Sequence, residues 1–359
     1  MSEINDNIVK IINQDMETLS DIVVSRQYEM QPDIWERYGP KGRELSLRDS
    51  NYHFRYLTQA LAEDDPTIFS NYVVWLKQLF EGLNFPPEAL TKMLECTKEI
   101  LREKLPPEMS LVTDKFIDTA STSTQRESEY ISSFLTPGLP LHELAKKYLD
   151  ALLAGKRHIA SKLILEAVQN GTSIKDIYIY VFQQSQYEIG RLWYLNKVSV
   201  GQEHYCSAAT QLIMSQLYPY IFSNEKNGLM FVAACVGGEL HELGIRMVAD
   251  LFEMDGWDTY YMGANTPTAT VFDAVTSYKP DVLGISVSLP THLGTLKNLI
   301  SEIRNNDEIG KVKIIVGGYA LRSSPDLWVK LGADGFALDA VKAVELANSL
   351  VAYKADLVY

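Results

Sequence analysis

A histidine flanked by carboxylates marks the point of this sequence where the residue types allow metal chemistry. The segment Glu239–Gly244 (Glu-Leu-His-Glu-Leu-Gly) follows the apolar run Leu229–Val236, which is typical of a buried parallel strand. Apolar residues then recur at helical spacing, so the chain is expected to turn from strand to helix through this segment. Neutral imidazole is a common metal ligand, and a neighbouring carboxylate can fix its tautomer. His241 is therefore a candidate metal ligand at the carboxyl edge of a sheet, where open α/β folds bind ligands.

The elements that would hold this loop lie in the last part of the chain. From about residue 228, apolar strands alternate with helical stretches, which predicts a doubly wound parallel sheet of the flavodoxin or Rossmann-like kind. No G-x-G-x-x-G pattern follows the first strand, which argues against dinucleotide binding. The predicted strands are 229–236, 259–262, 282–287 and 314–316, and the predicted helices are 241–254, 266–277 and 292–305.

Two helical regions precede the predicted sheet. The first contains helices opened by proline, at Asp65-Pro66 and at Pro86-Pro87, and shows no parallel-strand pattern. A clear linker, Pro137–Pro140 (Pro-Gly-Leu-Pro), separates it from four amphipathic helices with short loops, which is the pattern of a four-helix bundle. The predicted fold class is α/β plus all-α. The predicted domains are a helical domain over 1–135, a bundle over 140–223 and a Rossmann-like domain over 228–359.

The composition argues against several classes of function. A formal net charge of −13 over 359 residues disfavours a nucleic-acid surface, which needs clustered Lys and Arg. Cys96, Cys206 and Cys235 are widely separated, which predicts neither a zinc ribbon nor a disulfide framework and suits a reducing compartment. The first residues lack a signal-peptide pattern, and no apolar run reaches the roughly 18 residues that span a bilayer. We therefore expect a soluble, cytoplasmic protein without membrane or nucleic-acid partners.

Two further strand ends make the histidine loop more specific. Ser286-Val287-Ser288 closes one predicted strand and Gly317-Gly318 closes another, so both are expected at the same sheet edge as His241. Together with the Glu-x-His-x-x-Gly loop, these segments resemble the cobalamin-binding domain of methionine synthase, corrinoid proteins, mutases and light sensors. The resemblance implies that His241 is the lower cobalt ligand. Ser288 departs from the family, which usually has an apolar residue at that position.

The same resemblance implies roles for the neighbouring residues. Glu239 would orient the histidine, Leu240 would belong to the cofactor-binding loop, and Gly244 would open the path of the dimethylbenzimidazole tail. The residues expected to contact that tail are Ser286, Ser288, Gly317 and Gly318. The alternative is a surface histidine before a helix in an unrelated flavodoxin-like domain.

The predicted bundle carries a second pattern, in which Trp193 is followed after nine residues by Glu203-His204. This W-x9-E-H pattern resembles the cap bundle of adenosylcobalamin photoreceptors of the carotenoid-gene repressor type. It implies that the indole covers the upper face of cobalt, and that Glu203 and His204 surround the adenosyl group, where the carboxylate can accept hydrogen bonds from ribose hydroxyls. The alternative is that the indole lies in the bundle core and that Glu203-His204 begins an ordinary helix.

One residue of the bundle departs from that photoreceptor pattern. In those repressors, the residue after the tryptophan is a histidine that captures cobalt after photolysis, and here it is Tyr194. We include Tyr194 among the candidate cofactor-binding residues. Either His204 or water could take the upper position instead, and the sequence does not choose between them.

The first helical domain resembles the N-terminal part of photocobilins, which join a globin-like domain to the cobalamin module and hold biliverdin close to the corrin. The resemblance runs through Arg37–Pro40, Tyr52–Leu57 and Asp65–Leu76. A bilin needs an aromatic slot and cations for its two propionates. The candidate bilin-binding residues are Arg37, Tyr38, Tyr52, His53, Arg55 and Trp75. The alternative is that the aromatic residues form a core and the arginines a solvated face.

These patterns together predict a light sensor rather than an enzyme. Adenosylcobalamin would lie between the bundle and the Rossmann-like domain, and biliverdin in the first domain would extend absorption toward the red. Photolysis would change the quaternary structure or a partner surface, so we expect a light-dependent homo-oligomer and an unidentified protein partner. Two other functions remain open: a corrinoid methyl carrier that serves a methyltransferase, and a heme or redox sensor on the same fold.

Overall fold

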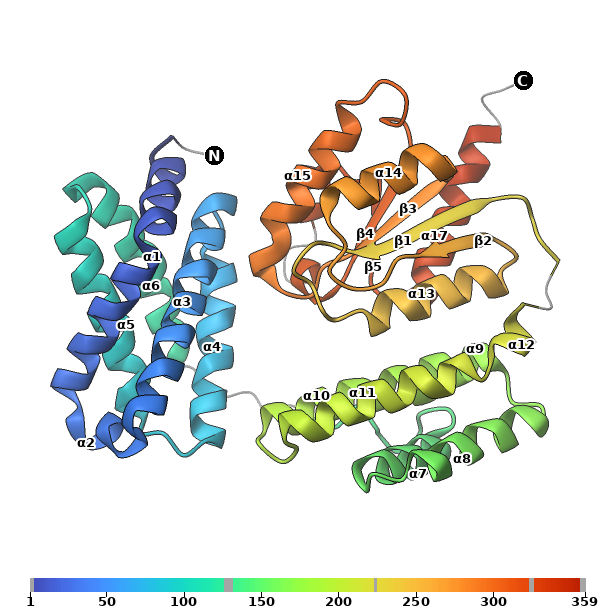
Figure 1. The fold of residues 1–359 in the computed structure, drawn as a ribbon, viewed down its shortest axis with the longest axis horizontal. Coiled ribbons are helices and arrows are strands. Elements are labelled where there is room, and N and C mark those ends of the chain that lie inside the picture. Colours follow the sequence, from blue (N-terminus) through green and yellow to red (C-terminus); the bar gives the residue numbers. More distant parts are fainter. Residues whose placement is uncertain (1–2, 126–131, 223–224, 323–325, 356–359) are drawn as a thin grey trace. The chain divides into compact units, whose positions relative to one another are not determined.

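The computed structural model describes residues 3–125, 132–222, 225–322 and 326–355, and the chain divides into two compact units (Figure 1). Unit 1 comprises Met1–Ile131 together with Tyr194–Lys197, and unit 2 comprises Ser132–Trp193 and Val198–Tyr359. Unit 1 is helical, whereas unit 2 combines a helical bundle with a parallel sheet. No helix in the described ranges combines the length and the hydropathy that a membrane crossing requires.

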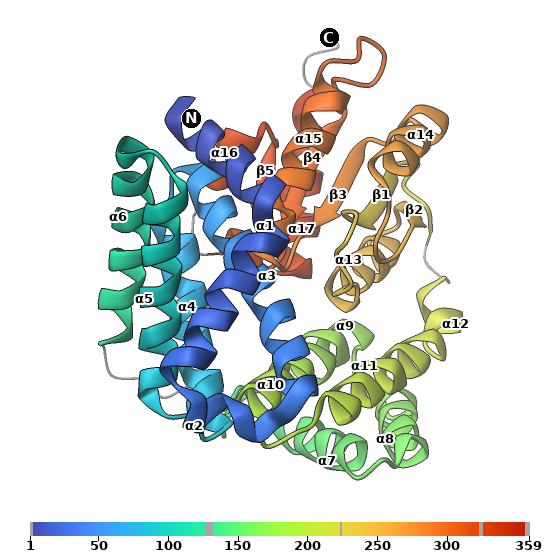
Figure 2. The same ribbon diagram turned by 60° about the vertical axis from the view of Figure 1, so that its left-hand side comes forward.

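Unit 1 consists of helices that run side by side (Figures 1 and 2). Its helices are α1 (Glu3–Met30), α2 (Pro32–Trp35), α3 (Gly39–Glu63), α4 (Pro66–Gly82), α5 (Pro87–Lys104) and α6 (Pro107–Thr124). The Asp65 carboxylate caps α4 by accepting a hydrogen bond from the backbone N–H of Thr67, and proline opens both α4 and α5. The predicted helix starts at Asp65-Pro66 and Pro86-Pro87 are therefore confirmed.

The helical part of unit 2 contains one element that the sequence did not predict. Its helices are α7 (His142–Leu153), α8 (Arg157–Gln169), α9 (Ile174–Asp176), α10 (Gln184–Tyr194), α11 (Val200–Ser215) and α12 (Tyr218–Ile221). Ser173 caps α9 and Ser199 forms a capping box with Gln202 at the start of α11. Between α9 and α10 the chain winds as a π-helix over Ile177–Gln183. A hydrophobic pattern over so few residues does not separate a π-helix from an α-helix, which is why only the structure reveals it.

Five parallel strands form the sheet of unit 2, in the order β2-β1-β3-β4-β5. The strands are β1 (Met230–Cys235), β2 (Asp258–Tyr261), β3 (Val282–Ser286), β4 (Lys313–Gly317) and β5 (Gly335–Ala337). Four of them match predicted strands. The fifth was missed because three residues are too short for a recognisable apolar run. The helices that follow the strands are α13 (Leu243–Met254), α14 (Thr268–Tyr278), α15 (Leu293–Arg304), α16 (Leu327–Leu331) and α17 (Ala340–Ala355).

The strand register brings the predicted ligand segments to one edge of the sheet. Cys235 at the end of β1 pairs with Ser286 at the end of β3, and Ser286 pairs with Gly317 at the end of β4. The helices α13 and α17 pack on one face, where they enclose a core with Phe231, Phe252 and Trp257. All these strands are parallel, so their carboxyl ends meet at a common edge. The expected convergence of the serine and glycine strand ends is therefore confirmed.

Helix α13 presents a stripe of polar side chains to the bundle. Glu242, Arg246 and Asp250 are spaced by four residues and so lie on one face of the helix. Gln211 of α11 donates a hydrogen bond to Glu242 Oε1 at 3.1 Å, and Arg246 Nη2 donates to Ser215 Oγ at 2.7 Å. The helix that follows the His241 loop is thus also the helix that contacts the bundle.

The last residue of this stripe is a buried acid. Tyr178 of the π-helix donates a hydrogen bond from its hydroxyl to Asp250 Oδ2 at 2.8 Å. Met247 and Leu251 of α13 join the bundle core around this contact. Burial raises the pKa of Asp250 to about 6, although the hydrogen bond from Tyr178 and the charge of Arg246 oppose the shift.

The conformation of Gly318 allows a test of the sheet edge. Its φ of +104° is a conformation that glycine adopts readily and that residues with a side chain rarely adopt. A Cβ at this position would also lie 2.8 Å from the backbone nitrogen of Val287. We expect Gly318→Ala to lower the free energy of unfolding by roughly 1–3 kcal/mol from backbone strain alone, and further through the overlap. Chemical denaturation measures this loss. Gly190→Ala is the control, because a Cβ on this helical glycine meets no atom within 4 Å. Equal stability of the two variants would contradict the prediction.

The raised pKa of Asp250 predicts a pH dependence of stability. A folded-state pKa of about 6, above the ordinary value of 3.8, means that the folded protein holds this proton more tightly than the unfolded chain. The contribution of Asp250 to stability is therefore largest below pH 4 and is lost as the pH rises to about 6. Between pH 4 and pH 7, the free energy of unfolding of the wild type should fall by roughly 2–3 kcal/mol relative to that of Asp250→Asn. Denaturant titrations measure this difference. The exposed carboxylate variant Asp273→Asn is the control, and a wild-type curve parallel to that of Asp250→Asn would disprove the assignment.

Candidate functional site

A carboxylate without any solvent exposure organises the carboxyl edge of the sheet. Glu239 is 0% exposed, and its Oε2 accepts hydrogen bonds from the backbone N–H groups of Ser288 at 2.7 Å and Leu289 at 2.9 Å. Its Oε1 accepts from the backbone N–H of His241 at 3.0 Å. The loop after β1 and the loop after β3 are therefore tied to the same side chain.

Two imidazoles complete the shell of hydrogen bonds around this carboxylate. His241 Nδ1 lies 2.5 Å from Glu239 Oε1, and His292 Nδ1 lies 3.3 Å from Glu239 Oε2. An ionised carboxylate only accepts hydrogen bonds, so each Nδ1 is the donor. The Nε2 lone pair of His241 is left available to a metal, and the His241 side chain is 62% exposed.

The electrostatics of the pair fit a metal-ligating histidine. Burial alone would raise the pKa of Glu239, but the hydrogen bonds from His241, His292 and two backbone amides outweigh it and hold that pKa well below the usual range. The hydrogen bond to Glu239 raises the pKa of His241 above its ordinary value, against the effect of burial. Glu203 on the bundle adds a smaller electrostatic contribution in the same direction. A basic imidazole with a fixed tautomer is the arrangement that a carboxylate–histidine–metal site uses.

Exposed apolar side chains follow several strands at the edge of the sheet that carries His241. Leu240 in the His241 loop is 70% exposed, Tyr319 directly after Gly318 is 73% exposed, and Leu338 directly after β5 is 57% exposed. Each follows the carboxyl end of a parallel strand. Exposed apolar groups that gather at one edge suit a large, flat and largely apolar ligand.

The predicted tail-channel residues have different surroundings. A Cβ on Gly244 would meet nothing within 4 Å, so space is open beside the start of α13. Ser286 is buried at the end of β3, and Ser288 contributes its backbone N–H to Glu239. Packing explains why position 318 is a glycine, because the Val287 backbone lies against it. Of these features, the open space beside Gly244 is therefore the one that packing or hydrogen bonding within the protein does not explain.

The bundle residues of the W-x9-E-H pattern fall in two places. Trp193 is half-buried in the last turn of α10, and Glu203 and His204 lie in the first turn of α11, where His204 Nδ1 contacts the Glu203 carboxylate. Tyr194 groups with unit 1 instead: its ring stacks with Trp75 at 6.1 Å, and its hydroxyl hydrogen-bonds to the Gln78 side chain.

The candidate bilin residues of unit 1 form two clusters rather than one. Arg37 donates a hydrogen bond to the Tyr38 hydroxyl at 2.8 Å just before α3. Tyr52, His53 and Arg55 lie in the middle of α3, about 20 Å further along by the rise of a helix. The first group therefore precedes α3, and the second lies several turns into it.

The second of these clusters contains a buried histidine. His53 Nδ1 lies 2.5 Å from the Tyr72 hydroxyl, and burial lowers the pKa of His53 to about 4, so the imidazole is neutral at pH 7. The Tyr72 ring stacks on Tyr56 at 3.9 Å and on Trp75 at 5.9 Å. Arg55 is exposed, with its guanidinium 5.8 Å from the Tyr52 ring. His53 and Tyr72 are buried and Tyr56 and Trp75 are half-buried, whereas Tyr52 and Arg55 lie at the surface.

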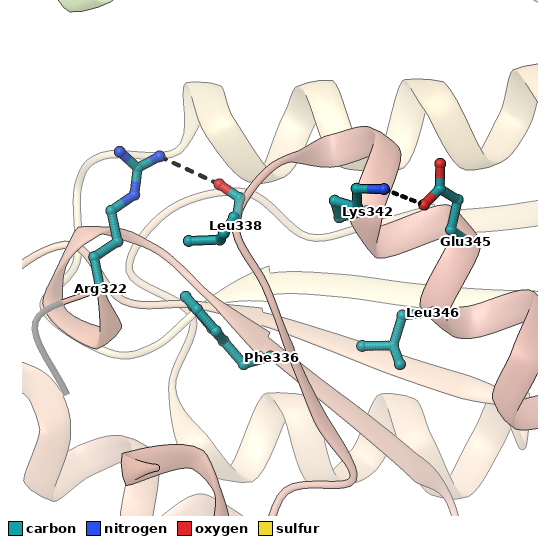
Figure 3. Close-up of a pocket in the computed structure, with 6 residues that line it drawn as sticks. All are labelled: Arg322, Phe336, Leu338, Lys342, Glu345 and Leu346. Atoms are coloured by element: carbon teal, nitrogen blue, oxygen red, sulfur yellow. Dashed lines mark hydrogen bonds and ion pairs between the residues drawn. The ribbon is translucent and has the colours of Figure 1, made fainter. Parts of the chain in front are cut away.

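A separate hollow lies beside the edge strand β5 (Figure 3). Its volume is about 720 Å³, and Phe336, Leu338 and Leu346 make its apolar part. Arg322, which donates to the Leu338 carbonyl at 3.2 Å, and the Lys342–Glu345 ion pair at 2.6 Å supply the charged part. It includes none of the residues predicted from the sequence.

Comparison with known proteins places the fold of unit 2 in a known class. Residues 230–346 match the model of the B12 binding domain, and residues 144–218 match a second B12 binding domain model. The bundle and the five-stranded sheet are the fold of corrinoid proteins, and the two matches support cobalamin as the ligand of unit 2. Residues 2–154 match the model of the phycobilisome protein family.

Individual relatives make the comparison more specific. A dimethylamine corrinoid protein of Methanosarcina barkeri is 29% identical over 140 residues, which is 39% of this chain and 64% of that protein, less than two thirds of its length. A corrinoid protein of Desulfitobacterium hafniense is 23% identical over 207 residues, or 56% of this chain and 94% of the relative. The structure of the Methanosarcina barkeri monomethylamine corrinoid protein is similar with a TM-score of 0.52 and 21% identity, covering 58% of this chain and 98% of that one. This last likeness concerns the fold.

Sequence reasoning missed His292 as part of the site. His292 lies in the turn before α15, six residues after Ser286, and an isolated histidine at that distance carries no motif. Only the folded chain shows that it shares Glu239 with His241, so it is not a neutral reference position for mutagenesis.

Glu239 provides a test of this arrangement that needs no ligand. In Glu239→Gln, the amide NH₂ replaces one of the two carboxylate oxygens and cannot accept hydrogen bonds. It would leave unsatisfied either the backbone N–H groups of Ser288 and Leu289 or the donors of His241. We expect the free energy of unfolding of the protein alone to fall by about 2–4 kcal/mol. Denaturant titration of this variant beside Glu302→Gln, an exposed position on α15, checks the result. The prediction is wrong if both variants are as stable as the wild type.

Proposed function

We propose that unit 2 binds a cobalamin with His241 as the lower cobalt ligand, and that the full chain is a light sensor that uses this cofactor. The observation that carries the binding proposal is the buried Glu239, which holds His241 Nδ1 at 2.5 Å and leaves Nε2 free at the sheet edge. When bound, adenosylcobalamin supplies a cobalt–carbon bond that light breaks.

The side chains around His241 have separate tasks in this proposal. Leu240 and Tyr319 would cover apolar parts of the corrin ring, because both are exposed apolar groups at the same edge. The open space at Gly244 would admit the nucleotide tail, with Ser286 and Gly317 beside it. On the bundle side, Trp193 would exclude water from the upper face, and Glu203 would accept hydrogen bonds from the adenosyl ribose.

The curated relatives favour a second candidate function. Two of them are named dimethylamine corrinoid proteins, and these names support a methyl carrier for a methyltransferase better than they support light sensing. The regions that these relatives match amount to 39% of this chain each. In this candidate function, the partner of unit 2 would be a methyltransferase.

Unit 1 is the observation that favours light sensing. Its match to the phycobilisome protein family supports a linear tetrapyrrole in this unit, since phycobilisomes are light-harvesting assemblies of bilin pigments. The packed cluster of His53, Tyr56, Tyr72 and Trp75 supplies aromatic surface and a neutral imidazole for pyrrole groups. We propose biliverdin as the pigment. The output would be a light-dependent change in self-association or in the surface offered to a protein partner.

Reconstitution of the full chain with adenosylcobalamin and biliverdin in the dark tests the proposal. We expect both pigments to be retained through gel filtration, and illumination to change the cobalamin absorption bands and the elution volume. His241→Ala should remove the imidazole-ligated spectrum, because it removes the proposed lower ligand. His158→Ala, an exposed histidine on α8, is the matched control and should behave like the wild type.

The outcomes separate the two candidates. Retained cobalamin with no response to light, together with methyl transfer from methylcobalamin-loaded protein to a thiol acceptor in the presence of a methyltransferase, would replace light sensing by methyl carriage. Loss of cobalamin from the wild type would refute the binding proposal itself.

A further inference from the structure

The hollow beside β5 lies at an open edge of the sheet (Figure 3). β5 pairs with β4 and is the last strand in the sheet order, so no strand of the described chain covers its other side. Phe336 points to one face of β5, because side chains alternate along a strand. Leu346 of α17 packs over Gly335 on the other face, where a Cβ would lie 2.6 Å from the Leu346 side chain. Since both Phe336 and Leu346 line the hollow, it wraps around the uncovered strand edge.

The size and the apolar lining of the hollow suit a small organic molecule. Its volume of about 720 Å³ lies within the range of ligand pockets, roughly 300–1,000 Å³. Leu338 is 57% exposed, and Phe336 and Leu346 are half-buried, so their apolar surface is open to solvent. A ligand with an apolar body would remove this surface from water, which is favourable.

Arg322 places a cation at the hollow, and neutral groups hold it there. Its Nη2 donates hydrogen bonds to the Tyr187 hydroxyl of α10 at 2.7 Å and to the Leu338 carbonyl at 3.2 Å. The guanidinium carbon lies 5.4 Å from the centre of the Tyr187 ring and 6.0 Å from that of Tyr319. Among the residues that the structure describes, no carboxylate forms an ion pair with Arg322, so its charge is not neutralised by them.

The other two charges at the hollow neutralise each other. Lys342 Nζ lies 2.6 Å from Glu345 Oε2, on the exposed side of α17. The hollow therefore keeps one uncompensated cation, on a chain whose formal net charge is −13. A guanidinium held in one orientation suits a carboxylate, because its planar fork can donate two parallel hydrogen bonds to the two oxygens. The electrostatics of the hollow thus favour an anion, and its walls favour an apolar body.

Arg322 also connects the hollow to the helical bundle of unit 2. Tyr187 belongs to α10, whereas Arg322 follows the strand end at Gly317 and Gly318. The same nitrogen, Nη2, makes both hydrogen bonds of this guanidinium. A carboxylate that binds through Nη2 would therefore compete with the Tyr187 hydroxyl.

We propose that the hollow beside β5 binds a small carboxylate with an apolar ring or chain. Arg322 binds the carboxylate, and Phe336, Leu338 and Leu346 contact the apolar body. The carboxylate displaces the Tyr187 hydroxyl from Nη2, so occupancy weakens one contact between the sheet and the bundle. None of the residues proposed to hold cobalamin lines the hollow, so this inference goes beyond the proposed function and does not depend on it.

Isothermal titration calorimetry of the full-length protein with 2-naphthoate tests the inference. We expect a single site with a dissociation constant on the order of 1 mM, which is usual for a ligand of this size. 2-Naphthylmethylamine has the same apolar body with a cation in place of the carboxylate. It should bind at least about 10-fold more weakly, because the guanidinium repels it.

Three variants separate the carboxylate contact from the apolar contact. Arg322→Gln should weaken naphthoate binding by about 10-fold or more, the usual effect of losing a charge-assisted hydrogen bond. Leu338→Ala should weaken it by about 3-fold to 10-fold through lost apolar contact. Tyr187→Phe keeps the cation and removes the competing hydroxyl, so binding should become about 2-fold to 5-fold tighter.

Lys330→Gln is the matched control, because it removes an exposed cation of α16 that does not line the hollow, and it should bind like the wild type. Equal binding by the wild type and Arg322→Gln would overturn the proposal, as would the absence of binding to the wild type. Displacement of naphthoate by saturating cyanocobalamin would also overturn it, since the hollow would then belong to the cofactor. Failure of cobalamin to bind would refute the proposed function and leave the naphthoate result unaffected.

Discussion

The arrangement at the sheet edge depends on the solvation of one carboxylate. Glu239 has lost all contact with water, and an ionised group in that position is tolerated only when its lone pairs are satisfied. Five donors satisfy them: two imidazole Nδ1 atoms and three backbone N–H groups from loops after β1 and β3. The same hydrogen bonds that make burial of the charge possible also fix the tautomer of His241 and the distance between the two loops. The geometry of the proposed cobalt ligand therefore follows from the requirement to satisfy a buried charge.

Helix α13 links this edge to the bundle. Its first turn follows the His241 loop, and the stripe of Glu242, Arg246 and Asp250 carries the polar contacts to α11 and the π-helix. Any change that moves the loop at the start of α13 acts on a helix that also contacts the bundle, the sheet and α17. The buried Asp250 is the costly member of the stripe, because burial raises its pKa to about 6. Helix α13 thus joins the ligand edge of unit 2 to its bundle, and residues of α17 pack into the same bundle core.

One boundary between the two units falls at the peptide bond between Trp193 and Tyr194. Trp193 belongs to unit 2 and Tyr194 belongs to unit 1, where its ring stacks with Trp75. Trp75 in turn stacks with Tyr72, the partner of the buried His53. The chain therefore connects the tryptophan of the proposed cobalamin cap directly to the aromatic cluster of the proposed pigment domain.

Much of the architecture follows from local patterns in the sequence. Helix starts at Asp65-Pro66 and Pro86-Pro87, the cap at Ser173 and four of the five strands are set by short-range preferences that need no knowledge of the fold. The motif around His241, with the strand ends at Ser286 and Gly317, indicated a cobalamin ligand because a loop motif and its partners recur with characteristic residue types. Neither β5 nor the π-helix could be seen, since each is too short to have a period of its own. Three features involve residues that are distant in sequence or assigned to different units. They are the sharing of Glu239 by His241 and His292, the separation of Tyr194 from Trp193, and the chain of hydrogen bonds from the buried Tyr148 through Thr210, Gln186 and Ser207 to Glu203.

Sequence by itself determined which side chains could bind a metal, because residue type sets that chemistry. Tertiary structure alone decided which of them meet, because hydrogen bonds between distant segments depend on how the elements pack.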